Sequence, residues 1–418
     1  MSNTPAQHHT GLTDSDGVAK SAAIARAHRR FGIDTEFMSE GRYRALLCLT
    51  QVAVEDADEP SGIRTILIDG LDSDLDVGPL ADVLADPEIE VILHAGQQDV
   101  AILRRSWRTD VTNVFDTQIA AGFVGESAQS GYGNLLSSLL SLRVGKTASY
   151  TRWDARPLTA EQLSYAAEDV AHLLQLADEI KRRLQLGGRY QWAVEECHRI
   201  EVATDERDPD AAWERLPRVG QLDPQSRSVA RRLAAWRERT AAREDRPTGQ
   251  VLQDPALLEL AKRHPADVRG LGQIRGIHPS LIKRRGEQIL LAIRDGLADP
   301  PIPREARRSG SDPSDAPLIP LAESLLRARA MEAGIAYELL ASRSELEQII
   351  SAARQAAPEP DVRTLRGWRR ELVGDELEAL LTGQAALSVG AGRRLQLDRG
   401  ATPAKHKASV ERPATTLR

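Results

Sequence analysis

The segment FGIDTEF at residues 31–37 places two acids inside an apolar run. Such a run predicts a strand, on which Asp34 and Glu36, two residues apart, point to the same face. The alternate residues take the opposite face, toward the core: Phe31, Ile33, Thr35 and Phe37. Two neighbouring carboxylates repel each other unless solvent screens them or a cation lies between them. The pair therefore indicates either an exposed sheet face or a metal site.

Further short apolar segments, bounded by Gly, Pro or acidic turns, surround this one and predict strands. With the first they lie at 31–37, 45–54, 64–69 and 91–94. Helical patterns are interleaved with the strands and then dominate, at 78–85, 97–106, 116–123, 132–142, about 159–185 and 189–202. This order predicts a mixed sheet flanked by helices, an α/β domain over residues 23–205. Residues 1–22 are polar and predicted to be disordered.

Three more candidate residues lie in the predicted helices. Asp99 follows the strand VILH and the loop AGQQ, near the start of a helix, where an acid also favours the helix dipole. Tyr165 and Asp169 are four residues apart and share one helix face, as an ordinary surface pair would. Oxygen ligands from separate elements suit hard divalent cations. Two such ions about 3.5–4 Å apart catalyse phosphodiester hydrolysis, so the acids predict a metal-dependent nuclease.

The order and context of these residues resemble a known group of enzymes. The segments DTEF, LHAGQQD, FDTQIAA, RWDARPLT and LSYAAEDV, within residues 31–185, are similar to the DEDD superfamily of 3′–5′ exonucleases, and in particular to the ribonuclease D family. The resemblance implies a ribonuclease H-like exonuclease domain. Tyr165 stands four residues before Asp169, and Ser164 occupies the position of the histidine in the other branch, so the chain is of the tyrosine type.

The resemblance also implies residue roles. The catalytic set is Asp34, Glu36, Asp99, Tyr165 and Asp169, and its four acids hold two Mg²⁺ or Mn²⁺ ions. Asp34, Glu36 and Asp169 would hold one ion, Asp34 would bridge to the second, and Asp99 would support the water shell of that second ion. Tyr165 would orient the attacking water. The expected reaction releases 5′-mononucleotides from RNA 3′ ends, as in maturation of tRNA precursors or trimming of other structured RNA with a 3′ tail.

One stretch differs from the family pattern. Arg152 precedes Trp153 where ribonuclease D usually has an acid, and Asp154 follows it instead. Packing and phosphate contact are both open as roles for Trp153, Arg152 and Lys146.

Charge is unevenly distributed along the 418 residues. The whole chain carries a formal charge of −6, whereas residues 225–297 hold 15 Lys and Arg against eight Asp and Glu. This purely helical stretch resembles the HRDC domain that follows the exonuclease domain in ribonuclease D, here at 218–298. A basic module on an acidic enzyme is typical of polyanion binding. The predicted nucleic-acid contacts are Lys146, Arg231, Arg232, Lys283, Arg284 and Arg285.

The remaining C-terminal residues divide into three segments. Residues 299–317 are rich in Pro, Ser and charge and predict a linker. Residues 318–396 are predicted to form a second, divergent HRDC-like helical domain, and residues 397–418 a disordered tail.

The sequence leaves other functions open. The same fold serves 3′–5′ DNA exonucleases, and sequence does not reveal contacts to the ribose 2′-hydroxyl. A catalytically silent nucleic-acid-binding scaffold and a protein-docking role for the basic helices are further alternatives. Only two cysteines and no run of 18 apolar residues or signal peptide favour a cytoplasmic protein without a membrane segment. A monomer is expected.

Overall fold

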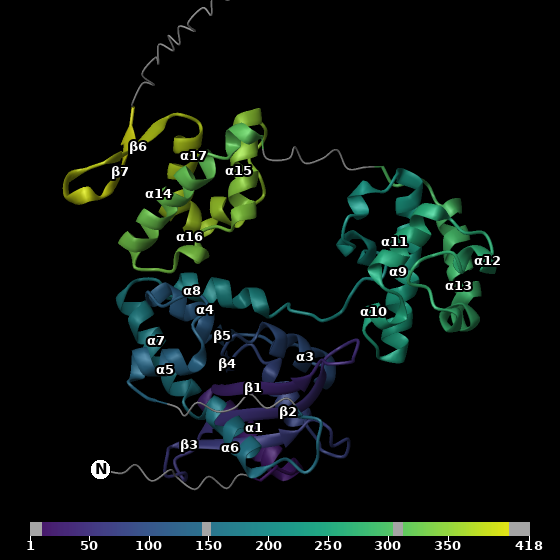
Figure 1. Cartoon of the computed structure of the whole chain (residues 1–418). Coiled ribbons are helices and arrows are strands. Elements are labelled where there is room, and N and C mark those ends of the chain that lie inside the picture. The colour runs from purple at the N-terminus through teal and green to yellow at the C-terminus, as the bar shows by residue number, and fades with distance from the viewer. Residues whose placement is uncertain (1–10, 144–151, 304–311, 401–418) are drawn as a thin grey trace, which may run out of the picture. The chain divides into compact units, whose positions relative to one another are not determined.

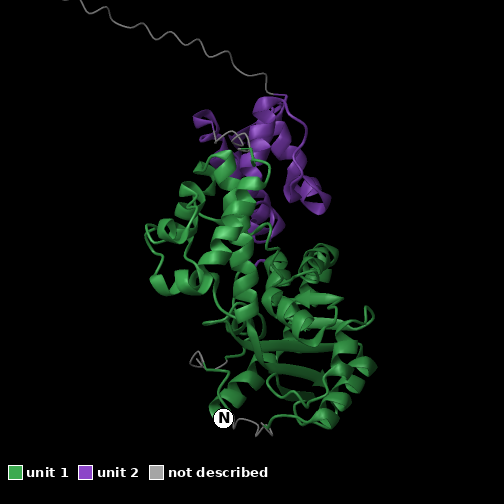
Figure 2. Cartoon of the chain, turned by 90° about the vertical axis from the view of Figure 1, so that its right-hand side faces the viewer, with its two compact units in different colours: residues 1–124, 129–308 green, residues 125–128, 309–418 purple. Residues whose placement is uncertain are grey.

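The computed structural model describes residues 11–143, 152–303 and 312–400. These residues fall into two compact units, which Figure 2 distinguishes by colour. The first unit contains a sheet domain followed by a set of helices, and the second contains the helices and the hairpin beyond residue 312.

A five-stranded sheet with the order β3-β2-β1-β4-β5 forms the centre of the first domain (Figure 1). β1 is antiparallel to β2 and parallel to β4, β2 and β3 are antiparallel, and β4 and β5 are parallel. The predicted mixed sheet is confirmed. β5 was not predicted, because its three residues are too few to show a period. The strands are Arg30–Met38, Leu46–Glu55, Ile63–Asp69, Glu90–Leu93 and Val114–Asp116.

Helices cover both faces of this sheet. α1 (Ser15–His28), α2 (Gly78–Leu84) and α3 (Gln97–Trp107) share one core with Phe31 and Ile33. Burial of each such side chain stabilises the fold by about 1.5–3 kcal/mol. α6 (Ala160–Ala171) and α7 (Leu173–Leu186) pack on the strands from the other side. Three further helices complete this domain: α4 (Thr117–Ala121), α5 (Tyr132–Leu140) and α8 (Tyr190–Cys197). α4, α5 and α8 each pack against α7, and α8 also packs against α4.

Two sequence predictions for this domain are wrong. Residues 11–22 were expected to be disordered, yet α1 begins at Ser15, where Asp14 accepts a hydrogen bond from the backbone N–H of Gly17. Val18 and two alanines bury the helix in the core. The sequence did not predict this helix because most of its buried side chains are small, which leaves only a weak apolar pattern. The long helix expected at 159–185 is two helices, because His172 departs from helical geometry (φ −113°, ψ 9°).

The basic stretch forms a helical domain, as predicted. Its helices are α9 (Pro224–Glu244), α10 (Thr248–Val251), α11 (Asp254–Arg263), α12 (Val268–Leu271) and α13 (Pro279–Ala298). α13 crosses α9 at Gly296, where a Cβ atom would lie 2.5 Å from the Cα of Val229. The start of the predicted linker is ordered instead: the N–H of Ile302 donates to the carbonyl of Pro224 (3.0 Å).

The second unit combines helices with a hairpin. Its main elements are α14 (Leu318–Ala333), α15 (Arg343–Gln355), α16 (Gly367–Arg369), α17 (Asp375–Leu381), β6 (Ala385–Val389) and β7 (Leu395–Arg399). The expectation of a purely helical segment to 396 and a disordered tail from 397 is therefore wrong for the hairpin. That this unit is a second HRDC-like domain stays a prediction.

Candidate active site

β1 carries the first two acids on the sheet face that α6 covers. Asp34 lies opposite Gln51 of β2, and Glu36 lies opposite Leu49. Leu49 belongs to the cluster against which Ala166 and Tyr165 of α6 pack. A break in the β1–β2 register follows directly after Glu36. The acids therefore lie between the sheet and the helix that carries Tyr165 and Asp169.

Asp99 is held at the start of α3 by a tight turn. Its carboxylate accepts a hydrogen bond from the hydroxyl of Thr35, the residue between the two acids of β1. The preceding turn is fixed by the buried carboxylate of Asp116, which accepts from the N–H groups of Gly96 (2.7 Å) and Ala95 (3.2 Å). Gly96 is required there, since a Cβ atom would lie 2.7 Å from the side chain of Leu93.

Tyr165 and Asp169 approach the same place from α6. The helix begins at a capping box formed by Thr159 and Gln162, which fixes its first turn. The hydroxyl of Tyr165 donates a hydrogen bond to Asp169, as the four-residue spacing allows. Charge on Glu36 and Asp34 also acts on this tyrosine. Tyr165 and Asp169 therefore interact electrostatically with Asp34 and Glu36, and Asp99 acts on the same two acids.

Burial and mutual repulsion disfavour the ionised forms of the four acids. Burial raises the pKa of Glu36 to about 8, with further contributions from Asp169 and Asp99. The pKa values of Asp99 and Asp169 rise to about 6, mainly through burial. Burial and the charges of the other three acids raise the pKa of Asp34 well above its ordinary range. The charges that act most strongly on Asp34 and Glu36 are thus other carboxylates.

The chemistry of these four carboxylates fits divalent cations, although their spacing in the structure is too wide to hold an ion. Four carboxylates from three separate elements supply the hard oxygen ligands that Mg²⁺ and Mn²⁺ prefer. Within residues 11–143, 152–303 and 312–400, however, no three His, Cys, Asp or Glu side chains are gathered closely enough to hold an ion as they stand. A bound cation would have to draw the carboxylates closer together. The chemistry of the set, hard oxygen donors from three elements, suits a metal site.

Sequence reasoning missed Tyr132, which interacts with the acids, and its neighbour His94. Tyr132 of α5 accepts a hydrogen bond from the N–H of His172 (3.1 Å), at the junction of α6 and α7. Burial raises the pKa of Tyr132, and Asp169 and Asp34 raise it further. The ring of His94 lies 5.6 Å from that of Tyr132. His94 belongs to the segment LHAGQQD, which was the available signal; Tyr132 gave none.

Gln51 is a second omission. Its side chain is fully buried, and neither amide atom has a hydrogen-bond partner within the described part of the chain. An unpaired buried amide costs about 1–3 kcal/mol, which marks the position opposite Asp34 as unusual. The signal was a glutamine within the apolar run ALLCLTQVAV.

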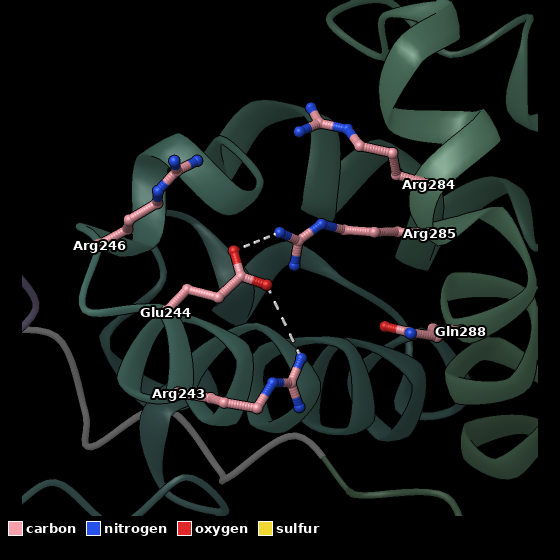
Figure 3. Close-up of a pocket in the computed structure, with 6 residues that line it drawn as sticks. All are labelled: Arg243, Glu244, Arg246, Arg284, Arg285 and Gln288. Atoms are coloured by element: carbon pink, nitrogen blue, oxygen red, sulfur yellow. Dashed lines mark hydrogen bonds and ion pairs between the residues drawn. The ribbon is translucent and has the colours of Figure 1, made fainter.

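The helical domain has a basic pocket of about 480 Å³ between the end of α9 and α13 (Figure 3). It is lined by Arg243, Glu244, Arg246, Arg284, Arg285 and Gln288. Glu244 binds Arg285 at 2.6 Å and lies 3.8 Å from Arg243. Figure 3 shows the guanidinium groups of Arg246 and Arg284 outside this ion-pair group. The pocket can therefore bind an anion through several arginines.

The other predicted nucleic-acid contacts differ from this group. Arg231 and Arg232 both bind Asp299, at 3.0 and 2.6 Å, and thereby hold the end of α13. That they contact RNA stays a prediction. Lys146 lies outside the described residues. The prediction for Lys283, Arg284 and Arg285 stands as a prediction.

Two family models match the chain. Residues 10–185 match the 3′–5′ exonuclease model, and residues 226–293 match the HRDC domain model. No helix in the described ranges is long and apolar enough to cross a membrane.

Individual proteins are similar over most of the chain. Ribonuclease D of Granulibacter bethesdensis is 36% identical over 93% of this chain and 96% of its own length. Ribonuclease D of Gluconacetobacter diazotrophicus is 36% identical over 86% and 90%. The crystal structure of Escherichia coli RNase D, described as an exoribonuclease involved in structured RNA processing, matches with a TM-score of 0.76 and 27% identity, over 89% of this chain and 98% of that one.

Proposed function

The chain belongs to the ribonuclease D family of 3′–5′ exoribonucleases, and from that premise we propose how its own residues carry out the reaction. The exonuclease fold implies dependence on divalent metal ions. We infer that two ions, Mg²⁺ or Mn²⁺, bind at the four acids on β1, α3 and α6. The supporting observation is the convergence of Asp34, Glu36, Asp99 and Asp169, whose strongest mutual influence is repulsion.

We propose that the acids divide between the two ions. Asp34, Glu36 and Asp169 would hold one ion, and Asp34 would also hold the second, whose water shell Asp99 would support. The chemistry that such a pair supplies is activation of water and neutralisation of charge on the leaving oxygen. The hydrogen bond from Thr35 fixes the orientation of Asp99. Binding of the metal ions should also lower the pKa values of these acids, because a cation favours their ionised forms.

Tyr165 is proposed to orient the attacking water. Burial first, and then the charges of Asp169 and Glu36, raise the pKa of its hydroxyl, so Tyr165 stays protonated at neutral pH. A protonated hydroxyl both donates and accepts hydrogen bonds but does not act as a strong base. Its donation to Asp169 leaves the oxygen lone pairs for the water.

The substrate is proposed to be RNA whose 3′ end is trimmed one nucleotide at a time, releasing 5′-mononucleotides. tRNA precursors and other structured RNA with a 3′ tail are the expected class. Arg284 and Arg285, with Arg243 and Arg246, would hold upstream phosphates in the basic pocket. A cytoplasmic location is proposed from the two buried free thiols, Cys48 and Cys197.

A comparison of substrates tests this function. A tRNA precursor, single-stranded RNA and single-stranded DNA, each labelled at the 3′ end, are incubated with Mg²⁺ or with Mn²⁺. We expect labelled mononucleotide from both RNAs and none in EDTA. Faster release from DNA would favour the alternative, a DNA exonuclease of the same fold. Asp34→Asn and Asp169→Asn should abolish release without unfolding the chain, and full activity in either variant would refute the metal-site proposal.

A further inference from the structure

The guanidinium group of Arg156 is completely engaged within the exonuclease domain. Arg156 lies in the segment RWDARPLT, just before α6. Its Nε and Nη2 donate to the two carboxylate oxygens of Asp69, the last residue of β3. Nη2 also donates to the carbonyl of Cys48 in β2 (2.8 Å). Nη1 donates to the carbonyls of Trp153 and Ala155, both at 2.8 Å. These bonds use all five N–H donors of the side chain.

Asp69 is equally well held. Beyond the two bonds from Arg156, it accepts a hydrogen bond from the N–H of Leu71 (2.9 Å). Burial opposes its ionisation, but these bonds hold its pKa below the ordinary value. The Asp69 side chain is 16% exposed and that of Arg156 is 26% exposed. A paired, partly buried group of this kind has little charge left for a phosphate.

The anchored loop supports the side of the active site that carries Tyr165. Trp153, whose carbonyl binds Arg156, is 3% exposed. Its ring centroid lies 6.1 Å from that of Tyr165, and the rings are inclined by 36°. Trp153 shares a core cluster with Cys48 and Ala166, and Tyr165 packs against that cluster. Any shift of this loop therefore reaches Tyr165 through packed side chains.

We propose that Arg156 and Asp69 form a clamp that positions Tyr165 through Trp153, and that Arg156 does not bind substrate phosphate. The consequence for catalysis rests on the proposed role of Tyr165 in orienting water. Lysine cannot replace arginine in the clamp, because an ammonium group has three donors and no planar fork. Arg156→Lys keeps the charge and loses the geometry.

The test compares Arg156→Lys with Arg182→Lys in the full-length chain with Mg²⁺ on single-stranded RNA. Arg182 is a matched control from the same domain, because it is 58% exposed and pairs with Glu179 of its own helix α7 (2.8 Å). We expect Arg156→Lys to lower kcat at least tenfold with KM within twofold of wild type, and Arg182→Lys to change neither. Asp69→Asn should reproduce the effect, and the double variant should lose little more, since the two residues act together.

A readout besides activity distinguishes failure of the clamp from failure of the proposed function. The Cys48 thiol is buried in the anchored cluster. A thiol reagent should therefore label Cys48 at least tenfold faster in Arg156→Lys than in wild type, while labelling of Cys197 stays constant, as peptide mapping would show. A raised KM and a shallower salt dependence, with unchanged kcat and labelling, would identify a phosphate contact and overturn the clamp. Faster labelling with unchanged kcat would keep the clamp but remove its link to Tyr165. Failure of the proposed role of Tyr165 in orienting water would show separately, as full activity of Tyr165→Phe.

Discussion

At the scale of single residues, Glu36 shows how strongly the site depends on a cation. A carboxyl whose pKa is about 8 in the folded chain and about 4.3 in the unfolded chain is protonated only in the folded state between these values. The folded state then binds more protons, so the free energy of unfolding falls as pH rises from about 4.3 to 8. The metal-free protein is thus destabilised at the pH where the enzyme is expected to work.

Glu36→Gln should therefore stabilise the metal-free protein. We expect its melting temperature in EDTA at pH 8 to rise by several degrees, since about 1 kcal/mol corresponds to about 2–4 °C for a domain of this size. At pH 5 the gain should vanish, and added Mg²⁺ should stabilise the variant less than wild type. Glu88→Gln, an acid that is 71% exposed, is the control. A lower melting temperature for Glu36→Gln at pH 8 would contradict the repulsion between the acids.

Tyr132 gives a second prediction at this scale. Tyr132→Phe removes the acceptor for the N–H of His172, three residues beyond Asp169. The junction of α6 and α7 should relax, so we expect kcat to fall about tenfold, equivalent to about 1.4 kcal/mol. KM for long RNA should not change. Tyr190→Phe, on α8, is the matched control, and equal kcat values for the two variants would exclude a positioning role for Tyr132.

The sequence revealed those site residues that lie in recognisable segments. Asp34, Glu36, Asp99, Tyr165 and Asp169 were found because the segments that contain them resemble the ribonuclease D family; alternation and helical spacing placed side chains on faces but left ordinary structural roles open. Tyr132 and Gln51 were not found, since their nearness to the acids depends on how α5 and β2 pack. Local patterns do not encode that packing.

At the scale of elements, the turn between β4 and α3 fixes Asp99, one of the proposed site residues. Asp116 is 1% exposed and also accepts hydrogen bonds from Gln118 and Ile119 at the start of α4. A single carboxylate therefore joins two helix starts and the turn that precedes Asp99. The sequence segment FDTQIAA pointed to this residue without showing what it holds.

Asp116→Ala should loosen both helix starts. Four backbone N–H groups would lose their acceptor, so we expect the free energy of unfolding to fall by at least about 2–3 kcal/mol, measured by urea denaturation. Asp110→Ala should be nearly neutral, because that side chain is 74% exposed in its ion pair with Arg104. Equal losses in the two variants would show that the turn is held by other contacts.

Element prediction succeeded where a period was long enough to be recognised. β1, β2 and the amphipathic helices α9 and α13 met this condition. α1 was missed because its buried face consists mainly of alanine and serine, and the break at His172 because both flanking helices continue one apolar period. Tertiary packing decides such cases.

At the scale of the whole molecule, about half of the positive charge of the helical domain is paired within the described part of the protein, because seven of its 15 Lys and Arg residues form ion pairs. Arg231 and Arg232 bind Asp299, Arg237 binds Asp254, and Arg239 binds Asp210. A net charge counted along the sequence thus overstates the free basic surface. In the basic pocket, Arg246 and Arg284 lie outside the ion-pair group and present cationic groups to a polyanion.

Replacement of Arg246 and Arg284 by alanine together should therefore affect long substrates selectively. Loss of two phosphate contacts should reduce the slope of log affinity against log salt by about 1.4 for single-stranded RNA. KM for long RNA should rise, while cleavage of a dinucleotide, too short to need the pocket, should stay within twofold. Arg239→Ala with Arg263→Ala removes the same charge from pairs outside the pocket and is the control. If both double variants weaken RNA binding equally, RNA binds through the net charge of the domain and not at the pocket. If only the first variant weakens binding, the basic pocket holds the upstream strand while the acids on β1, α3 and α6 act on its 3′ end.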